Sequence, residues 1–234
     1  MGEGVLNILM RGQDYYNTNY INYDRQTSLR KVEFYLKLVR KWVPHGNRIF
    51  ELGVGMGYFL QRASSEFECM GCDINDFGVD AARNRAPNLP IRKGSYECIP
   101  CNRSQKAIVS WDVLEHISDL DVALSHIYSS LVFGGFLIGV VPVYDGPLGW
   151  LVRLLDHDRT HVWKWSKKQW FHVLERHHFR VVECGGVIRK LLLFRFYVHI
   201  IWPKWLLRSV GSALYFVAEK NESFLEMNTF GEIS

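Results

Sequence analysis

The sequence predicts an α/β protein built on an open, doubly wound, mostly parallel sheet with helices on both faces. Strand-like and helix-like patterns alternate through the first part of the chain, as in βαβ units. A glycine-rich turn at 53–57 joins a strand pattern to a helix pattern, and 136–141 is an almost continuous apolar run, typical of a strand covered on both faces. With 234 residues, 48% of them hydrophobic, the chain can bury a sizeable core, so we expect one domain over 1–234.

Hydrophobic periodicity and turn signals place the individual elements. A capping box at Ser166 and Gln169 predicts the start of the last helix, Ser118 is the expected N-cap of the preceding one, and Gly134 and Gly135 are expected to end that helix. The seven strands of the sheet are expected at 48–52, 67–73, 90–93, 107–110, 136–141, 179–184 and 213–218, and the helices at 28–42, 58–64, 77–85, 119–131 and 166–177.

The net charge of the chain is small, and the excess of basic residues lies in one segment. It has 28 basic and 24 acidic residues, a formal charge of +4, and residues 187–217 alone hold five basic residues and no acidic one. A dedicated nucleic-acid binder has a broader basic surface, so we expect no nucleic-acid partner. We predict that the apolar insertion at 187–210, if helical, caps the acceptor pocket, contacts a second copy in a homodimer, or lies peripherally at a membrane surface.

The sequence shows neither a secretory signal pattern nor a run of about 20 apolar residues that could span a membrane, and we expect a cytoplasmic protein. Two CxxC pairs have the spacing of a zinc site, but Cys69 and Cys72 fall in a predicted strand, where residues three apart point to opposite faces. His157 and His161, with nearby aspartates, also resemble a metal-ligand cluster that no helix would hold in place. We therefore expect reduced thiols and no metal.

The glycine-rich turn carries the clearest chemical signal. Gly53, Gly55 and Gly57 would let the backbone approach a ligand closely, whereas Tyr58 stands where a dinucleotide-binding fingerprint needs glycine or alanine. Asp73 ends the next strand, 20 residues after Gly53, where a carboxylate can accept hydrogen bonds from both ribose hydroxyls of a nucleoside ligand. The alternative is that Asp73 only caps the next helix.

Several motifs in this order resemble the class I S-adenosylmethionine-dependent methyltransferases, particularly the broad small-molecule group related to the ubiquinone and menaquinone methyltransferases. The resemblance covers about Asn47 to Gly186 and implies a Rossmann-like seven-stranded sheet. The matching segments are Glu51-Leu-Gly-Val-Gly-Met-Gly57, Gly71-Cys-Asp-Ile74, Asp112-Val-Leu-Glu-His116, Gly134-Gly-Phe-Leu-Ile138 with Pro142, and Asp158-Arg-Thr-His161 with Trp165-Ser166.

The resemblance implies S-adenosyl-L-methionine as the cofactor, with S-adenosyl-L-homocysteine as its product, and a position-by-position set of binding residues. Ser95 stands where the family often has aspartate, and His178 replaces a usual glycine. The implied cofactor-binding residues are Glu51, Gly53, Gly55, Gly57, Asp73, Ile74, Ser95, Tyr96, Ser110 and Leu114.

The resemblance also divides the domain by task. Residues 1–44 would form an N-terminal helical lid, in which Tyr20 and Tyr23 could contact cofactor or acceptor, although an ordinary solvent-facing tail is the equal alternative. Residues 45–145 would form the cofactor-binding core. Residues 146–234 would supply the substrate-side loop with His157, the last helix, and the last strands with the insertion at 187–210.

Methyl transfer is an in-line displacement that needs a general base only when the acceptor is protonated. His116 and His161 are the candidate catalytic residues, and a packing role for His116 is the alternative. We therefore predict a methyltransferase acting on an O, N or C nucleophile of a small-molecule or lipid-like acceptor. The alternative function is a catalytically silent methyltransferase-fold subunit that supports a partner enzyme.

Overall fold

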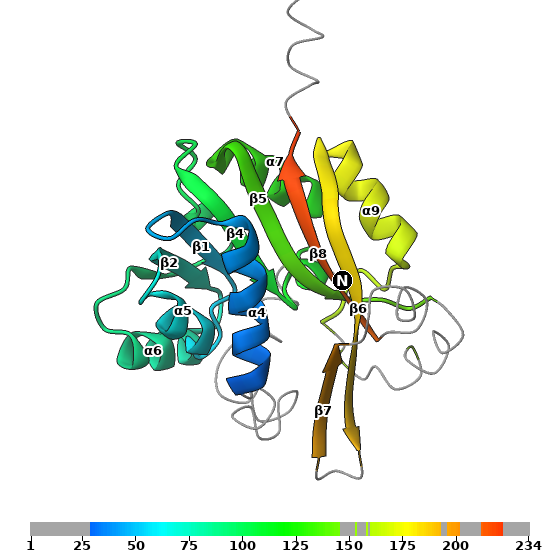
Figure 1. Ribbon diagram of the computed structural model, residues 1–234, viewed down its shortest axis with the longest axis horizontal. Coiled ribbons are helices and arrows are strands. Elements are labelled where there is room, and N and C mark those ends of the chain that lie inside the picture. The colour runs from blue at the N-terminus through cyan, green and yellow to red at the C-terminus, as the bar shows by residue number, and fades with distance from the viewer. Residues whose placement is uncertain are drawn as a thin grey trace, which may run out of the picture.

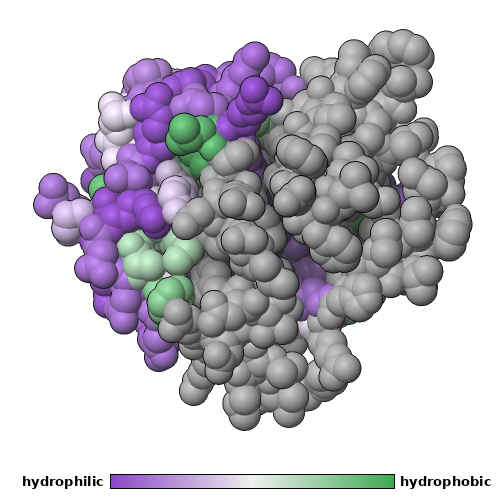
Figure 2. Space-filling model, turned by 90° about the horizontal axis from the view of Figure 1, so that it is seen from below, coloured by the Kyte–Doolittle hydropathy of each residue, from purple (hydrophilic) through white to green (hydrophobic). Residues whose placement is uncertain are grey.

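The computed structural model describes residues 29–145, 153, 158, 160–192, 196–201 and 212–221. Tyr20, Tyr23, His157 and most of the expected lid lie outside these described residues. Seen from below, the described surface is mostly hydrophilic, with a few separate apolar groups (Figure 2).

The described strands form one sheet of eight, in the order β3-β2-β1-β4-β5-β8-β6-β7 (Figure 1). The pairings from β3 to β5 are parallel, and those of β8 with β5 and of β6 with β8 and β7 are antiparallel. All seven expected strands are present in a mostly parallel sheet. The strands are β1 (Arg48–Leu52), β2 (Glu68–Asp73), β3 (Ile91–Lys93), β4 (Gln105–Trp111), β5 (Leu131–Pro142), β6 (Phe179–Leu192), β7 (Phe196–Ile201) and β8 (Ala213–Lys220).

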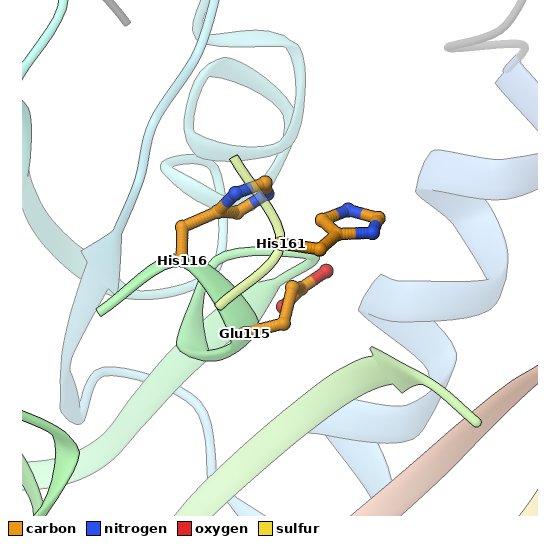
Figure 3. A group of neighbouring side chains, drawn as sticks. All are labelled: Glu115, His116 and His161. Carbon is orange, nitrogen blue, oxygen red and sulfur yellow. The ribbon is translucent and has the colours of Figure 1, made fainter. Parts of the chain in front are cut away.

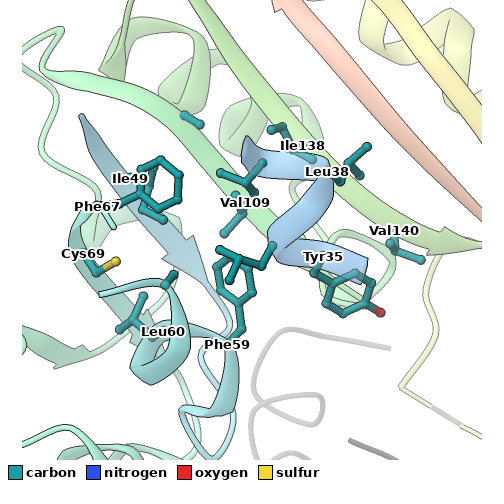
Figure 4. Close-up of a cluster of buried hydrophobic side chains, with 14 of the residues drawn as sticks. Tyr35, Leu38, Ile49, Phe59, Leu60, Phe67, Cys69, Val109, Ile138 and Val140 are labelled. Atoms are coloured by element: carbon teal, nitrogen blue, oxygen red, sulfur yellow. The ribbon is translucent and has the colours of Figure 1, made fainter. Parts of the chain in front are cut away.

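Helices cover both faces of the sheet, as predicted. Leu36, Leu60 and Val79 join one buried apolar cluster (Figure 4), and Leu124 and Trp170 join the other. The first cluster therefore places α4, α5 and α6 on one face, and the second places α7 and α9 on the opposite face. The helices are α4 (Leu29–Trp42), α5 (Tyr58–Ala63), α6 (Asp76–Arg85), α7 (Leu120–Ser130) and α9 (Lys167–Arg176), with short 3-10 turns η1 (Tyr96–Cys98) and η2 (Leu114–His116).

The two cysteines of β2 point to opposite sides of the sheet. Cys69 packs in the first apolar cluster and Cys72 in the second, which confirms the orientation expected of a strand. Burial raises the pKa of Cys69 to about 12, so this thiol stays protonated. The pair cannot close on one metal ion.

Helix α7 lies within one residue of its expected bounds, but the residues expected to cap and to end it are wrong. Asp119 is the N-cap rather than Ser118, and it makes no capping bond because its carboxylate accepts from the Tyr96 hydroxyl. The helix ends at Ser130 and passes directly into β5. Gly134 lies within β5 and has a φ of +61°, in the stretch where the pairing with β4 shifts register. Glycine there permits an irregularity of the strand rather than ending the helix.

Other local expectations are confirmed. The capping box of α9 is formed, since Gln169 N donates to Ser166 Oγ at 3.3 Å and Ser166 N donates to Gln169 Oε1 at 2.9 Å. His178, at the position of a family glycine, has a φ of +62°. This left-handed conformation explains why glycine is usual there.

The helix considered for 187–210 is not formed in the part that the structure describes. β6 continues to Leu192 and pairs antiparallel with β7, from Val187 opposite Ile201 to Leu192 opposite Phe196. The paired stretches are rich in β-branched and aromatic residues, which favour a strand once a partner strand is available. This hairpin extends beyond the rest of the sheet (Figure 1). Among the described residues, no helix is long and apolar enough to cross a membrane.

The packing of β8 between two strands predicts an unequal response to truncation of two phenylalanines. Phe216 is 0% exposed, whereas Phe133 is 54% exposed. Phe216→Ala should lower the free energy of unfolding by about 3–5 kcal/mol through loss of apolar contact and creation of a cavity, and Phe133→Ala by less than about 1 kcal/mol. Urea denaturation of the two variants measures this difference. Equal costs would contradict the assignment of Phe216 to the core.

Candidate active site

The candidate active site lies where the strand order of the sheet reverses. β1 pairs with β2 on one side and with β4 on the other, so successive connections leave in opposite directions from the gap between β1 and β4. Open α/β sheets bind ligands at the carboxyl ends of the strands beside such a switch point. The glycine loop follows β1, Asp73 ends β2, and Ser110 lies near the end of β4.

The glycine loop needs glycine for steric reasons. Gly53 has a φ of +82°, and a Cβ there would lie 2.2 Å from Val113 Cγ2. Gly57 has a φ of +79°, and a Cβ there would lie 2.9 Å from the Cα of Ala82 in α6. Both the conformation and the close approach exclude larger residues. The loop is anchored to β2, because the N–H groups of Gly53 and Val54 donate to the Cys72 carbonyl at 2.8 and 3.0 Å.

Asp73 is held at the end of β2 by backbone donors. Its Oδ2 accepts from Gly55 N and its Oδ1 from Asn75 N, both at 2.8 Å. The alternative helix-capping role belongs to Asn75, whose Oδ1 accepts from Gly78 N at 3.1 Å. Desolvation raises the pKa of Asp73 while these backbone bonds lower it. A carboxylate oxygen can accept more than one hydrogen bond, so Asp73 keeps acceptor capacity for a ligand.

Glu51 and Ser110 bring unsatisfied polar atoms to the same region. The Glu51 carboxyl is buried in β1, and desolvation and the Asp73 carboxylate raise its pKa well above the usual value, against the opposing effect of the nearby backbone of Leu60. Neither Glu51 Oε2 nor Ser110 Oγ has a hydrogen-bond partner among the described residues. Such atoms cost free energy until a ligand satisfies them. The Asp73 carboxylate can accept hydrogen bonds from ribose hydroxyls. Together, these three side chains fit the amino-acid and nucleoside parts of S-adenosylmethionine.

The expected adenine side lies next to the end of β2. Ile74, Ser95 and Tyr96 are all half-buried. The Ser95 carbonyl accepts from Cys72 Sγ at 3.1 Å, which ties the turn before η1 to β2. Leu114 is fully buried in the second apolar cluster. The contacts of these four residues with the cofactor stay predictions.

The fold brings the two candidate catalytic histidines together. His116 follows β4 in η2 and His161 comes from the loop before α9, and their ring centroids are 4.8 Å apart. Glu115 lies beside them (Figure 3), and its backbone carbonyl accepts from Val162 N at 2.9 Å and Trp163 N at 3.2 Å. These two bonds hold the 161–163 segment against η2. Sequence reasoning did not select Glu115, although it directly precedes His116.

A chain of hydrogen bonds orients the His116 ring. Thr160 Oγ1 donates to Asp158 Oδ1 at 2.5 Å, so its oxygen is left to accept from His116 Nδ1 at 2.8 Å. Nδ1 therefore carries the proton and Nε2 carries the lone pair. Burial and the neighbouring His161 lower the pKa of His116 to about 4, so its imidazole is neutral at pH 7. The His116 ring is thus buried, as the packing alternative expects, and its orientation is fixed by hydrogen bonds, as a catalytic role would need.

His161 is half-buried and has its own oriented partner. Its Nδ1 lies 2.9 Å from the hydroxyl of Tyr144, and its Nε2 lies 3.8 Å from Asp158 Oδ2. Tyr144 has no sequence signal of its own, since its role depends on the loop returning to the end of β4. Thr160 and Asp158 belong to the Asp158-Arg-Thr-His161 motif, but neither was selected as a site residue.

An open α/β sheet with a glycine loop, an acidic residue at the end of the second strand and polar groups at the switch point is typical of enzymes that bind a nucleoside cofactor. The sequence matches the family described as "Methyltransferase domain" over residues 4–184, which is more than half of the chain. The chain therefore belongs to this family and is a class I methyltransferase that uses S-adenosylmethionine. No curated protein matches the sequence.

Solved structures share the fold at low sequence identity. The YcgJ protein of Bacillus subtilis is 16% identical, with a TM-score of 0.62 over 82% of this chain and 100% of that one. A possible histamine N-methyltransferase of Thermotoga maritima is 19% identical, with a TM-score of 0.63 over 87% and 97%. A chain from the complex between the Haloferax volcanii Trm112 methyltransferase activator and a methyltransferase is 17% identical, with a TM-score of 0.68 over 93% and 98%. At this identity the likeness establishes the fold.

The raised pKa of Glu51 predicts a specific pH dependence of stability. A carboxyl whose pKa is higher in the folded than in the unfolded state takes up a proton on folding, so its contribution to stability falls as the pH rises above about 4.3, the usual value for glutamate. Glu51→Gln removes this contribution. From pH 5 to pH 8, the free energy of unfolding of the cofactor-free variant should therefore fall less than that of the wild type.

Urea denaturation at both pH values measures the effect. Glu175→Gln, which changes an exposed carboxyl on α9, is the control and should follow the wild type. Parallel pH profiles for wild type and Glu51→Gln would contradict the prediction.

Proposed function

We propose that this methyltransferase transfers the methyl group of S-adenosylmethionine to an O, N or C nucleophile of a small-molecule or lipid-like acceptor bound beyond the end of β4. The observation that carries this proposal is the pairing of His116 and His161 at the strand edge that also holds the glycine loop and Asp73. Cofactor and acceptor groups would then meet at one edge of the sheet.

The chain's part in this reaction is to position the reactants and exclude water. When bound, S-adenosylmethionine supplies a methyl group activated by its sulfonium. Asp73 would hold the ribose, the glycine loop would allow close approach of the backbone, and Glu51 and Ser110 would orient the amino-acid part. Alignment of the nucleophile with the methyl carbon provides most of the acceleration in such a displacement.

His116 and His161 would act on the reacting group of the acceptor. Two imidazoles with defined hydrogen-bond partners offer ring nitrogens at fixed positions, which suits an acceptor that carries O–H or N–H. The relation to the ubiquinone and menaquinone group stays a prediction.

The hairpin of β6 and β7 provides a proposed contact surface. β7 is at the edge of the sheet formed by the described strands, and an edge strand can pair with another chain. The basic residues of the 187–217 segment would equally suit an anionic membrane surface. We therefore propose that this hairpin contacts either a second copy of the chain or a membrane surface.

Cofactor binding separates an enzyme from the silent-subunit alternative. Wild-type protein should bind S-adenosylhomocysteine in isothermal titration calorimetry, and Asp73→Ala should weaken binding at least about 10-fold, since hydrogen bonds to a charged group contribute about 1.5–3 kcal/mol each. Asp76→Ala, which removes an exposed carboxylate three residues away, should bind like the wild type. If the wild type did not bind S-adenosylhomocysteine, the proposed enzymatic function would be refuted.

Turnover tests the two histidines. With radiolabelled S-adenosylmethionine and the best of a panel of phenol, amine and lipid acceptors, His161→Ala should lower kcat by about 100-fold or more while leaving the Kd of the cofactor unchanged. His172→Ala removes an exposed histidine of α9 and serves as the control. Unchanged kcat in His161→Ala would contradict the catalytic assignment.

A further inference from the structure

We propose that Glu115, His116 and His161 form a binding site for one divalent first-row transition-metal ion on the acceptor side of the active site. This differs from the sequence expectation of no metal. That expectation considered the two CxxC pairs and the histidines and aspartates of 156–161, whereas two of the three ligands proposed here come from η2. The role of the ion in methyl transfer rests on the proposed function, but its binding does not.

The three side chains converge on one point. One possible ligand atom from each, an imidazole nitrogen from His116 and His161 and a carboxylate oxygen from Glu115, lies within 4.8 Å of the others (Figure 3). Atoms bonded to a single zinc ion at about 2.1 Å are about 3–4 Å apart. Side-chain rotations that close the group by about an ångström would therefore complete the site.

The hydrogen-bond partners of the two imidazoles are those of metal ligands. A ligating histidine generally uses its other ring nitrogen to bond a carboxylate, carbonyl or hydroxyl, which fixes ring orientation and tautomer. In His116, Nδ1 bonds Thr160 Oγ1, and Thr160 bonds Asp158, so Nε2 offers the lone pair. In His161, Nδ1 bonds the Tyr144 hydroxyl.

The backbone holds the ligands in place before any ion binds. The Glu115 carbonyl accepts from Val162 and Trp163, and Trp163 Nε1 donates to the Ile117 carbonyl at 2.6 Å. These bonds flank the ligands on both segments, so little chain entropy would be lost on binding.

The ligand types indicate the class of ion and what else it would bind. Two imidazoles and one carboxylate suit Zn²⁺, Fe²⁺, Mn²⁺ or Ni²⁺ and are too nitrogen-rich for Ca²⁺ or Mg²⁺. Glu115 is 1% exposed and His116 is 4% exposed, so both lie in a region of low dielectric, where the attraction between a carboxylate and a cation is stronger than in water. Three protein ligands leave coordination positions open, as in catalytic sites. An acceptor with a hydroxyl, phenol or carboxylate oxygen could occupy one of them.

Metal binding by the full-length protein tests the proposal directly. After removal of metals with a chelator, the wild type should bind one equivalent of Co²⁺, seen as visible absorption, and Zn²⁺ should displace it. His161→Ala and Glu115→Gln should weaken Co²⁺ binding by about 100-fold or more, because each removes one of three ligands. Thr160→Val keeps all three ligands and should weaken binding about 10–100-fold, the usual effect of losing the partner that orients a ligand.

Matched controls are available on α9. His172→Ala and Glu175→Gln remove an exposed imidazole and an exposed carboxylate and should bind Co²⁺ like the wild type. Failure of the wild type to bind Co²⁺ saturably, or equal binding by wild type and His161→Ala, would overturn the proposal.

Calorimetry with S-adenosylhomocysteine on every variant shows whether each is folded and separates the two proposals. Cofactor binding without metal binding would reject the metal site and leave the proposed function standing. Metal binding without cofactor binding would reject the proposed function and leave the metal site standing.

Discussion

The structure depends on the close passage of the glycine loop between its neighbours. At Gly53 the backbone is so near Val113 that a Cβ would overlap its side chain, and the same loop is bonded to the Cys72 carbonyl and the Asp73 carboxylate. One short segment thus sets the spacing of β1, β2 and the turn after β4. Because these three carry the groups proposed to bind the cofactor, the steric requirement for glycine also sets the relative positions of those groups.

A second constraint acts on the other side of the switch point. The Glu115 carbonyl binds the 161–163 segment, so a loop that follows β5 returns to the end of β4 and brings His161 to His116. Thr160 and Asp158 then determine which nitrogen of His116 carries the proton. Backbone hydrogen bonds thus join η2, which carries His116, to the segment that carries His161. Such fixed positions suit a reaction that depends on the alignment of its reactants.

Elements that depend on local interactions agree with the sequence-based prediction, whereas elements that depend on pairing with a distant strand do not. The strands from β1 to β4 and the capping box at Ser166 follow from periodicity and local side-chain chemistry, and they lie within about two residues of their expected positions. The early start of β5 at Leu131 and the hairpin of β6 with β7 differ from expectation, because both depend on a partner strand that no local pattern reveals. An apolar run is compatible with helix or strand until its pairing is known.

The sequence by itself determined the class of fold, the glycine loop, Asp73 and the two candidate histidines, since each belongs to a motif whose residues are neighbours along the chain. Only the tertiary structure decided that Glu115, His116 and His161 share one site, that Asn75 rather than Asp73 caps α6, and that Glu51 and Ser110 are buried with polar atoms unsatisfied among the described residues. The physical reason is that burial, tautomer and convergence arise from contacts between segments distant in sequence, which no local pattern encodes.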